Sequence, residues 1–284
     1  MPRAKCIAFV NHKGGTGKTT SCLSIAGYLA KSGNKVLVVD FDPQASATLG
    51  LGIDPMTVEY SVYDAILGQC DGYEGVPMTR LILETKVENL HCAPSQFDLA
   101  IAEALMLKNK RRATMLNRIL EEVRPLYDYI LIDLPPGSGL LTINGLCAAD
   151  QVVVPLEPSI YSLEVLHNLK TAFCDIKQMT GHSINHVSCV LTRYVKPNAL
   201  SGMLINHNAS KEIETRLRKM FQTVFLVPES ARIYEAQLES LPISHYAPKS
   251  RVGKAYAEIA TALGNNGKKK SGMNKLEAIK EEAK

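Results

Sequence analysis

One segment, residues 12–20, limits the possible folds of this chain more than any other. It reads His-Lys-Gly-Gly-Thr-Gly-Lys-Thr-Thr and stands between a short apolar run, residues 6–11, and residues 19–31, whose apolar side chains recur at helical spacing. Glycines let a chain curl so that successive N–H groups point inward at phosphate oxygens, and the N-terminus of the following helix adds partial positive charge. A Gly-rich hairpin turn would need neither the strand before it nor the helix after it. The segment therefore predicts a phosphate-binding loop on an α/β scaffold.

The side chains of this loop suit a nucleoside triphosphate bound together with a metal ion. Lys18 can reach the β- and γ-phosphates, and the hydroxyl of Thr19 can ligate Mg²⁺. We therefore expect ATP and Mg²⁺ as cofactors. The residues expected to contact ATP in this loop are Lys13, Gly14, Gly15, Thr16, Gly17, Lys18, Thr19 and Thr20.

The rest of the chain alternates between continuous apolar runs and helical patterns. Continuous Val, Ile and Leu runs indicate strands that are buried on both faces, so we expect one doubly wound, mostly parallel sheet with helices on both faces. We predict a single domain, residues 1–264, and a basic, disordered tail, residues 265–284. The further strands are expected at residues 35–40, 89–94, 129–133, 151–155, 187–192 and 224–227, and the further helices at 99–106, 112–123, 140–148, 163–180, 210–221 and 253–263.

Polar residues end three of the predicted strands. Asn11, Asp40 and Asp133 each follow an apolar run directly, and Asp42 comes two residues after Asp40. Ligands of parallel sheets bind beyond the carboxyl ends of the strands, so we expect these side chains to converge on the phosphate-binding loop. We predict a metal site at Thr19, Asp40 and Asp133, with both aspartates holding the ion through water. Strand-terminating acids in a turn are the alternative for Asp40 and Asp42.

Charge separates the predicted domain from the tail. The whole chain carries +4, and its last 20 residues hold six lysines and three acids, which leaves 26 basic and 25 acidic residues in the remainder. Any surface of the domain that binds an anion must therefore come from how its charges are arranged. The chain contains no Trp, so we do not expect an aromatic surface on which the bases of a single-stranded nucleic acid would stack.

The cysteines and the apolar runs indicate a cytoplasmic protein. The seven cysteines contain no C-x-x-C pair and several lie in apolar runs, so we expect reduced, buried thiols, although a cluster shared across a dimer stays open. We also expect no signal peptide, no membrane span and no helix-turn-helix before the first strand.

The details of these motifs resemble one family of ATPases. The segment Lys-Gly-Gly-Thr-Gly-Lys-Thr-Thr resembles the deviant Walker A motif of the ParA/MinD family, although His12 stands where the general motif has its first glycine. In that family the lysine matching Lys13 reaches the phosphates of the partner in an ATP-bound homodimer. Asp-Phe-Asp-Pro-Gln-Ala-Ser, from Asp40, is similar to switch I, and Asp133-Leu-Pro-Pro-Gly is similar to switch II. The resemblance implies that the catalytic residues are Lys13, Lys18 and Asp42. It also implies that Thr192 and Pro228 contact adenine.

Within the family the chain is most similar to ParA proteins of the Soj type. These bind double-stranded DNA without sequence preference as ATP dimers, associate with the nucleoid, and are reset when a ParB-like or cargo-bound partner stimulates hydrolysis. The resemblance thus implies a role in chromosome or plasmid partition, or in cargo positioning. Arg232 matches a DNA-contacting arginine in register, and Lys196 stands near a second such position. The other DNA-binding candidates are Arg216, Arg218, Lys219, Lys249, Arg251 and Lys254.

Two other functions share this scaffold. A MinD-like ATPase would cycle on a membrane, but residues 274–284 offer only a thin apolar edge with three glutamates, so we expect no membrane binding. A small-molecule enzyme, such as a P-loop ligase or a nitrogenase-reductase-like electron donor, is the third alternative. For residues 210–221 a plain amphipathic helix with solvated charges explains the pattern as well as DNA binding does.

Overall fold

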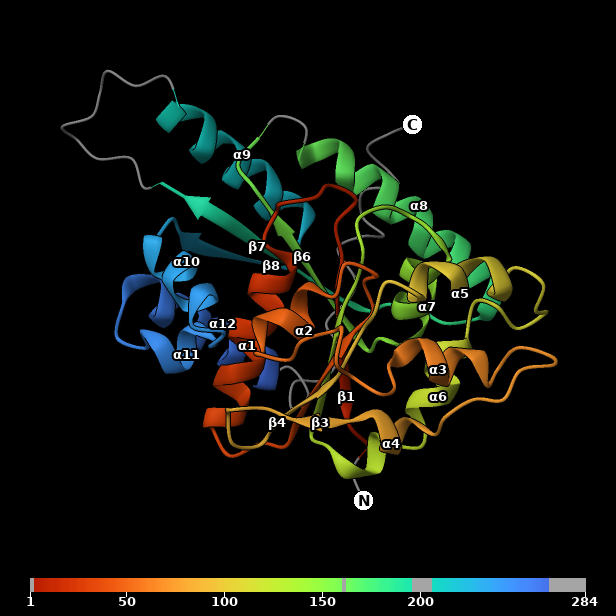
Figure 1. The fold of residues 1–284 in the computed structure, drawn as a ribbon. Coiled ribbons are helices and arrows are strands. Elements are labelled where there is room, and N and C mark those ends of the chain that lie inside the picture. The colour runs from red at the N-terminus through yellow and green to blue at the C-terminus, as the bar shows by residue number, and fades with distance from the viewer. Residues whose placement is uncertain (1–2, 160–161, 196–205, 266–284) are drawn as a thin grey trace.

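The computed structural model describes residues 3–159, 162–195 and 206–265 of the chain, and these form one sheet with helices on both faces (Figure 1). Within them the sheet has eight strands in the order β3-β4-β2-β5-β1-β6-β7-β8. All neighbours are parallel except β3 and β4, which are antiparallel. The strands are β1 (Lys5–Phe9), β2 (Val36–Asp40), β3 (Leu83–Glu84), β4 (Leu90–Ala93), β5 (Tyr129–Asp133), β6 (Gln151–Leu156), β7 (His186–Tyr194) and β8 (Thr223–Pro228). The expected doubly wound α/β fold is confirmed.

The helices divide into two layers. One apolar cluster joins one face of the sheet to α1, α2, α10, α11 and α12, and a second cluster joins the other face to α3–α9. The first layer comprises α1 (Lys18–Lys31), α2 (Ser46–Gly50), α10 (Ala231–Leu238), α11 (Ile243–Tyr246) and α12 (Arg251–Asn265). The second comprises α3 (Val62–Leu67), α4 (Met78–Leu81), α5 (Leu99–Met106), α6 (Met115–Leu120), α7 (Leu140–Ala148), α8 (Ser162–Thr180) and α9 (Asn206–Met220), with the short 3₁₀ helix η1 (Arg124–Leu126) beside it.

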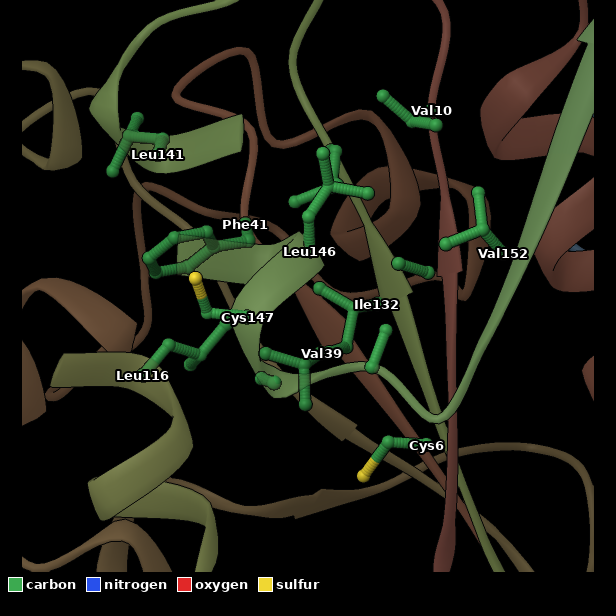
Figure 2. Packing of buried hydrophobic residues seen from close by; sticks show 14 of the residues in the cluster. Cys6, Val10, Val39, Phe41, Leu116, Ile132, Leu141, Leu146, Cys147 and Val152 are labelled. Carbon is green, nitrogen blue, oxygen red and sulfur yellow. The ribbon is translucent and has the colours of Figure 1, made fainter. Parts of the chain in front are cut away.

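Burial on both faces explains why the apolar runs form these strands. Every residue of β2 is buried, including its final residue, Asp40. On the face of the second layer, Val39 and Ile132 of the strands lie under Leu146 and Cys147 of α7 and Leu116 of α6 (Figure 2). A strand covered by helices on both sides has no solvent-facing positions, so its sequence does not alternate between apolar and polar residues.

Most predicted elements are found, and the differences concern short pieces. The expected strands agree closely with β1, β2 and β4–β8, whereas β3, α2, α3, α4, α10 and α11 were not predicted. Helices of four to eight residues are too short to show a clear apolar repeat. For α3 a capping box was present in the sequence, since Ser61 and Asp64 cap each other's backbone at its start. The helix expected at residues 112–123 is wrong in length, because only Met115–Leu120 is helical. Asn265, the first residue of the predicted tail, is the last residue of α12, and residues 266–284 lie outside the described residues.

The cysteines are as expected in the folded chain. All seven are free, and all are buried except Cys174. The described residues contain no group of three or more His, Cys, Asp and Glu side chains that could hold a metal ion. They also contain no helix that is long and apolar enough to cross a membrane.

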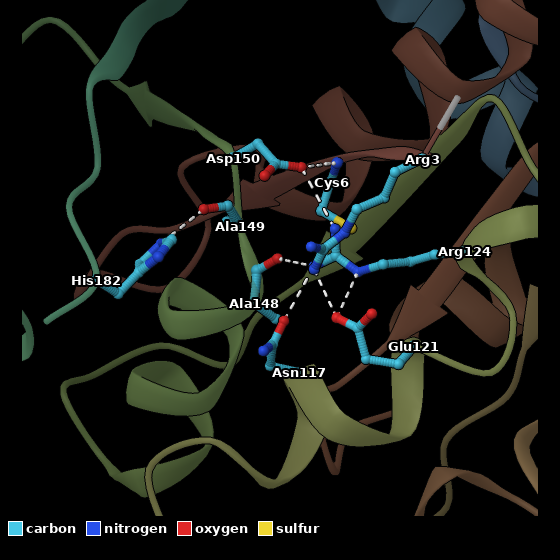
Figure 3. Close-up of polar contacts among 9 residues, drawn as sticks. All are labelled: Arg3, Cys6, Asn117, Glu121, Arg124, Ala148, Ala149, Asp150 and His182. Carbon is cyan, nitrogen blue, oxygen red and sulfur yellow. Dashed lines mark hydrogen bonds and ion pairs between the residues drawn. The ribbon is translucent and has the colours of Figure 1, made fainter. Parts of the chain in front are cut away.

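A buried arginine stabilises the edge of the sheet opposite the carboxyl ends of β1, β2 and β5. The guanidinium of Arg124 donates to Oδ1 of Asn117 at 3.0 Å and to the carbonyl of Ala148 at 2.9 Å (Figure 3). It also forms ion pairs with Glu121 and Asp150, each at 3.6 Å. Asp150 in turn accepts from the backbone N–H of Cys6 at 2.8 Å. One side chain therefore connects η1, α6, the end of α7 and the start of β1.

We predict that Arg124→Ala destabilises the protein by about 3 kcal/mol, because buried acceptors and two carboxylates lose their cationic partner. Urea unfolding followed by circular dichroism measures this change. Arg216→Ala is the control, since its ion pair with Glu212 lies on the surface and should change stability by less than about 0.5 kcal/mol. Equal stability of the two variants would contradict the proposed importance of Arg124.

Candidate functional site

Strand register places the candidate site at the carboxyl ends of three adjacent strands. Phe9, the last residue of β1, lies opposite Asp133 of β5, and Asp133 lies opposite Asp40 of β2. The central position of β5 therefore puts Asp133 between the loop that follows β1 and the loop that follows β2. Asn11, Asp40 and Asp133 are all buried there, as expected from the strand ends.

The loop between β1 and α1 has the shape that a phosphate group needs. Gly15 and Gly17 have φ angles of +76° and +87°, which residues with a side chain rarely adopt. Gly17 is the N-cap of α1, so no side chain caps the helix there, and the first turn contains no acidic residue. The N–H groups of that turn and the positive end of the helix are therefore available to an anion.

Internal hydrogen bonds hold the loop in this shape. The side chain of Asn11 donates to the carbonyl of Pro155 at 2.6 Å and accepts from the backbone N–H of Lys13 at 3.0 Å. The carbonyl of Lys13 accepts from Thr16 Oγ1 at 3.4 Å and from Lys18 Nζ at 3.5 Å. Burial lowers the pKa of Lys18, while Asp133 and Asp42 oppose that shift. The loop is thus held by its own side chains and carbonyls, with Lys18 inside it.

The side chain of Thr192, in β7, supports the phosphate-binding loop. Its buried hydroxyl lies 3.0 Å from the carbonyl of Thr16 and 3.1 Å from the carbonyl of Leu156, and both are acceptors. Its methyl group would lie 3.3 Å from a Cβ on Gly17, so the side chain of Thr192 packs closely against this glycine. The adenine contact that the family resemblance implies for Thr192 stays a prediction, as does that of Pro228, the half-buried last residue of β8. In this structure the hydroxyl of Thr192 contacts the phosphate-binding loop.

Thr19 and Asp133 form the part of the site that fits a divalent cation. The hydroxyl of Thr19 donates to Oδ2 of Asp133 at 2.6 Å. The other oxygen, Oδ1, is buried and has no hydrogen-bond partner among the described residues. Burial, and then the carboxyl of Asp40, raise the pKa of Asp133 well above its ordinary value. A cation beside Oδ1 would supply the missing partner and favour the ionised carboxylate.

Asp40 is held by its own protein surroundings. One of its oxygens accepts from both the backbone N–H and the hydroxyl of Thr48, each at 2.7 Å, and the other accepts from the N–H of Asp42 at 3.3 Å. Burial raises the pKa of Asp40 to about 6, against the effect of these hydrogen bonds. Its metal role stays a prediction. The geometry shows that Asp40 fixes the turn that carries Asp42.

The two other residues expected to be catalytic lie at different depths. Asp42 is buried, and its Oδ1 accepts from the N–H of Gln44 at 2.9 Å. Lys13 is exposed, and its side-chain ammonium has no ion-pair partner among the residues the structure describes. Of the remaining loop residues, Thr20 accepts from Nε2 of Gln237 in α10 at 3.2 Å, which links the start of α1 to the C-terminal helices.

His12 is a site residue to which the sequence assigned no role. Its ring lies near the backbone of Gly137, which favours the protonated imidazole, while its Nε2 is buried and has no partner in the described part of the chain. Burial is the main cause that lowers the pKa of this imidazole. Gly137 follows the Pro pair after β5 and has a φ of +106°. His12 therefore joins the phosphate-binding loop to the loop after Asp133, which no sequence motif indicated.

Comparison with known proteins identifies the family. Residues 4–186 match the family described as AAA domain. Over 264 residues the chain is 37% identical to the sporulation initiation inhibitor protein Soj of Bacillus subtilis (strain 168), covering 93% of this chain and 99% of that protein. It is also 34% identical to the chromosome-partitioning ATPase Soj of Treponema pallidum (strain Nichols), covering 91% of this chain and 96% of that protein. The chain belongs to the ParA/Soj/MinD family of deviant Walker A ATPases.

Solved structures share the fold of this chain. Cobyrinic acid a,c-diamide synthase from Mycobacterium smegmatis, with bound ATP analogue and magnesium, superposes with a TM-score of 0.77 and 28% identity over 95% of this chain and 97% of that chain. The septum site-determining protein MinD of Pyrococcus horikoshii, complexed with Mg-ADP, has a TM-score of 0.70 at 24% identity over 95% of this chain and all of that chain, which shows the shared fold. As a ParA-family member the chain is an ATPase, as predicted.

The residues that the resemblance to ParA proteins suggested for DNA binding do not form one surface in a single chain. Helix α9, with Arg216, Arg218 and Lys219, packs on one face of the sheet, and α10–α12 pack on the other (Figure 1). Lys196 lies outside the described residues. Three of the four arginines of this set are paired on their own helices: Arg216 with Glu212, Arg218 with Glu214 and Arg232 with Glu235.

In contrast to these three arginines, Arg251 and the described lysines of the set form no ion pair with a described residue. Lys249, Arg251 and Lys254 are exposed at or near the start of α12, and none has a carboxylate partner among the described residues. Lys219 on α9 is also exposed and unpaired within that part of the chain. DNA binding by any of these residues stays a prediction, and the structure favours the start of α12 as the more strongly positive site.

We predict that Thr192→Val weakens nucleotide binding about tenfold, because the carbonyl of Thr16 loses its donor and the ligand must then order the loop. Thr192→Ser keeps the hydroxyl and should bind almost as the wild type does. Isothermal titration with ATP and with inorganic triphosphate separates the two roles of Thr192. Support of the loop predicts equal losses for both ligands, whereas an effect on ATP alone would show an adenine contact instead.

Proposed function

We propose that this chain is a partition ATPase of the ParA/Soj type, which dimerises on ATP, binds double-stranded DNA without sequence preference and is reset by hydrolysis. The observation that carries the proposal is the position of Lys13. The loop does not need its side chain, since Lys18 and the first turn of α1 would serve the phosphates bound to the same chain. Family membership and the printed roles of Soj and ParA relatives support the rest.

An exposed cation beside a preformed phosphate site suits action on a second subunit. The backbone of Lys13 is fixed by Asn11, while its side chain points to no acceptor among the described residues. A lysine that completes the partner's site makes charge stabilisation during phosphoryl transfer depend on dimerisation, as an arginine finger does. Dimerisation and hydrolysis are thereby linked through one side chain.

The remaining residues divide the chemistry of hydrolysis. Lys18, released from the carbonyl of Lys13, would neutralise charge on the transferred phosphoryl group. Asp42, on the turn that Asp40 fixes, would orient the attacking water. Thr19 and the free oxygen of Asp133 would hold Mg²⁺, which supplies charge neutralisation on the phosphates. His12 would report the state of the phosphate-binding loop to the loop after Asp133 through Gly137.

The positive start of α12 supports the DNA-binding part of the proposal. Lys249, Arg251 and Lys254 have no carboxylate partners in the described part of the chain, so their charges are available to phosphates. Dimerisation doubles such a surface, and binding that releases counterions depends steeply on the number of contacts. A DNA-bound or cargo-bound activator and a cytoplasmic, nucleoid-associated location follow from the same proposal. A MinD-like membrane cycle has no supporting observation in the described residues.

We predict that Asp42→Ala lowers ATP hydrolysis about 100-fold or more and leaves an ATP-bound dimer, whereas Lys13→Ala binds ATP and stays monomeric. Light scattering coupled to size exclusion gives the mass, and phosphate release gives the rate. Lys18→Ala is the control that should bind no nucleotide. An Asp42→Ala protein that hydrolyses ATP at the normal rate would show that Asp42 is not the carboxylate that orients the attacking water.

We predict that the triple variant Lys249→Ala, Arg251→Ala, Lys254→Ala weakens ATP-dependent binding of a random-sequence duplex more than the matched triple Arg216→Ala, Arg218→Ala, Lys219→Ala. The first set should reduce the slope of log affinity against log salt by roughly one unit per lost phosphate contact. Glutamates already neutralise two of the three charges in the second set. Fluorescence anisotropy at several salt concentrations measures both. Equal losses from the two triples would contradict the preference for α12.

A further inference from the structure

Strand β7 is irregular at its carboxyl end, where it lies between β6 and β8 (Figure 1). Leu191 pairs with Leu226 and Tyr194 pairs with Pro228, so three steps along β7 match two steps along β8. One extra residue of β7, between Leu191 and Tyr194, is therefore bulged out of the ladder. Bulges of this kind redirect a side chain and are frequent beside active sites.

The bulge changes the side of the sheet that each side chain faces. In a regular strand, residues an odd number of positions apart face opposite sides. Leu191 and Tyr194 are three positions apart, yet both belong to the apolar cluster of the second helix layer, and the hydroxyl of Tyr194 donates to Glu214 of α9 at 2.7 Å. Thr192, which a regular strand would turn to the same side as Tyr194, instead contacts the phosphate-binding loop. The bulge thus lets one strand end serve both contacts.

Arg193, within the bulge, has a backbone conformation that few residues with a side chain adopt. Its φ angle is +50°, in the left-handed region. Such outliers persist only where the surrounding structure determines them, and they occur most often at functional sites. The side chain of Arg193 is exposed, and its Nη1 forms an ion pair with Oε1 of Glu157. Because Glu157 directly follows β6, this pair ties the bulge to the end of the neighbouring strand.

The bulge directs the hydroxyl of Thr192 at two carbonyls. One belongs to Leu156, the last residue of β6, at 3.1 Å, and the other belongs to Thr16 in the phosphate-binding loop, at 3.0 Å. In a planar trans peptide the C=O and the following N–H point in opposite directions. A Thr16 carbonyl that is held toward β7 therefore fixes the N–H of Gly17 so that it points away from β7. The N–H groups of such a loop are the donors to a bound phosphate.

We propose that Arg193 is a positioning residue for phosphate binding. Its left-handed backbone forms the bulge, the bulge aims Thr192 at the carbonyl of Thr16, and that hydrogen bond orients the N–H of Gly17 toward the phosphate. The guanidinium of Arg193 has no contact with the ligand in this role. Its ion pair with Glu157 offsets part of the strain, so an arginine is tolerated at a position that suits glycine or asparagine. The role belongs to the ATPase activity and does not depend on DNA or on a partner protein.

Two other roles for this strained residue lead to different expectations. If the bulge serves only the packing of Tyr194 on α9, changes at position 193 alter stability and leave the affinity for phosphate as it is. If the guanidinium of Arg193 binds a phosphate directly, every replacement weakens binding, whatever its backbone preference. The positioning role alone predicts that affinity follows the ease with which residue 193 adopts a positive φ.

The experiment compares replacements of Arg193 by glycine, asparagine, alanine and valine in the full chain. Asparagine and valine are similar in size and uncharged, but asparagine tolerates a positive φ and the β-branched valine does not. Isothermal titration with inorganic triphosphate and Mg²⁺ measures the affinity. Arg193→Gly and Arg193→Asn should bind within about threefold of the wild type, and Arg193→Val should bind about tenfold more weakly, as Thr192→Val does, with Arg193→Ala between them.

A double-mutant cycle tests whether Arg193 acts through Thr192. The variant that combines Arg193→Val with Thr192→Val should bind triphosphate no more than about twofold more weakly than Thr192→Val alone, because the hydroxyl that the bulge positions is already absent. In Arg193→Val the KM for ATP should rise with the dissociation constant while kcat changes less than about twofold, since bound substrate orders the loop. Melting curves show whether each variant is folded, and Arg193→Ala takes the place of Arg193→Val if valine prevents folding.

Each of three outcomes would contradict this role of Arg193. Equal losses of affinity from Arg193→Asn and Arg193→Val would assign the effect to the missing guanidinium. Unchanged triphosphate affinity in both Arg193→Val and Arg193→Ala would restrict the bulge to the packing of Tyr194. Full additivity in the double-mutant cycle would show that residue 193 acts on the site by a route other than Thr192.

Discussion

The parallel register of β1, β5 and β2 is the constraint on which the site depends. These strands are buried on both faces, so polar residues are tolerated only at their ends. The parallel register brings the carboxyl ends of the three strands to the same edge of the sheet. Asp133 then lies within hydrogen-bond distance of Thr19, which α1 carries. A change of register by one residue would turn Asp133 toward a helix layer and separate it from the loop. The register that packs the core therefore also determines where the carboxylates lie.

The sequence predicted the parts of the fold and site that depend on local patterns. The apolar runs gave the strand positions, and residues 12–20 gave the loop and the helix after it. The positions of Asp40, Asp42 and Asp133 at strand ends followed from a general rule for parallel sheets. The sequence also contains a signal for the pairing of Arg216 with Glu212 and of Arg218 with Glu214, because a spacing of four residues brings helical side chains together. Our prediction for residues 210–221 did not include these ion pairs.

Other features depend on contacts between residues that are far apart in the chain. Thr192 reaches the carbonyl of Thr16, which lies 176 residues earlier, and nothing near Thr192 in the sequence indicates that acceptor. Thr48 donates a hydrogen bond to Asp40, but the sequence does not predict this role because a lone threonine in a short helix has no distinguishing pattern. The division of the basic residues between two faces likewise follows from the positions of α9 and α12 on the sheet, which only the tertiary structure shows.

The contact between Lys18 and the carbonyl of Lys13 has a consequence for how the ATPase meets its ligand. The ammonium already lies inside the loop, desolvated in part and held by an internal acceptor. An incoming phosphate therefore replaces a weak backbone partner rather than a full shell of water. Much of the cost of organising the site is met when the protein folds, so little of the free energy of the phosphate contacts is needed to order the loop.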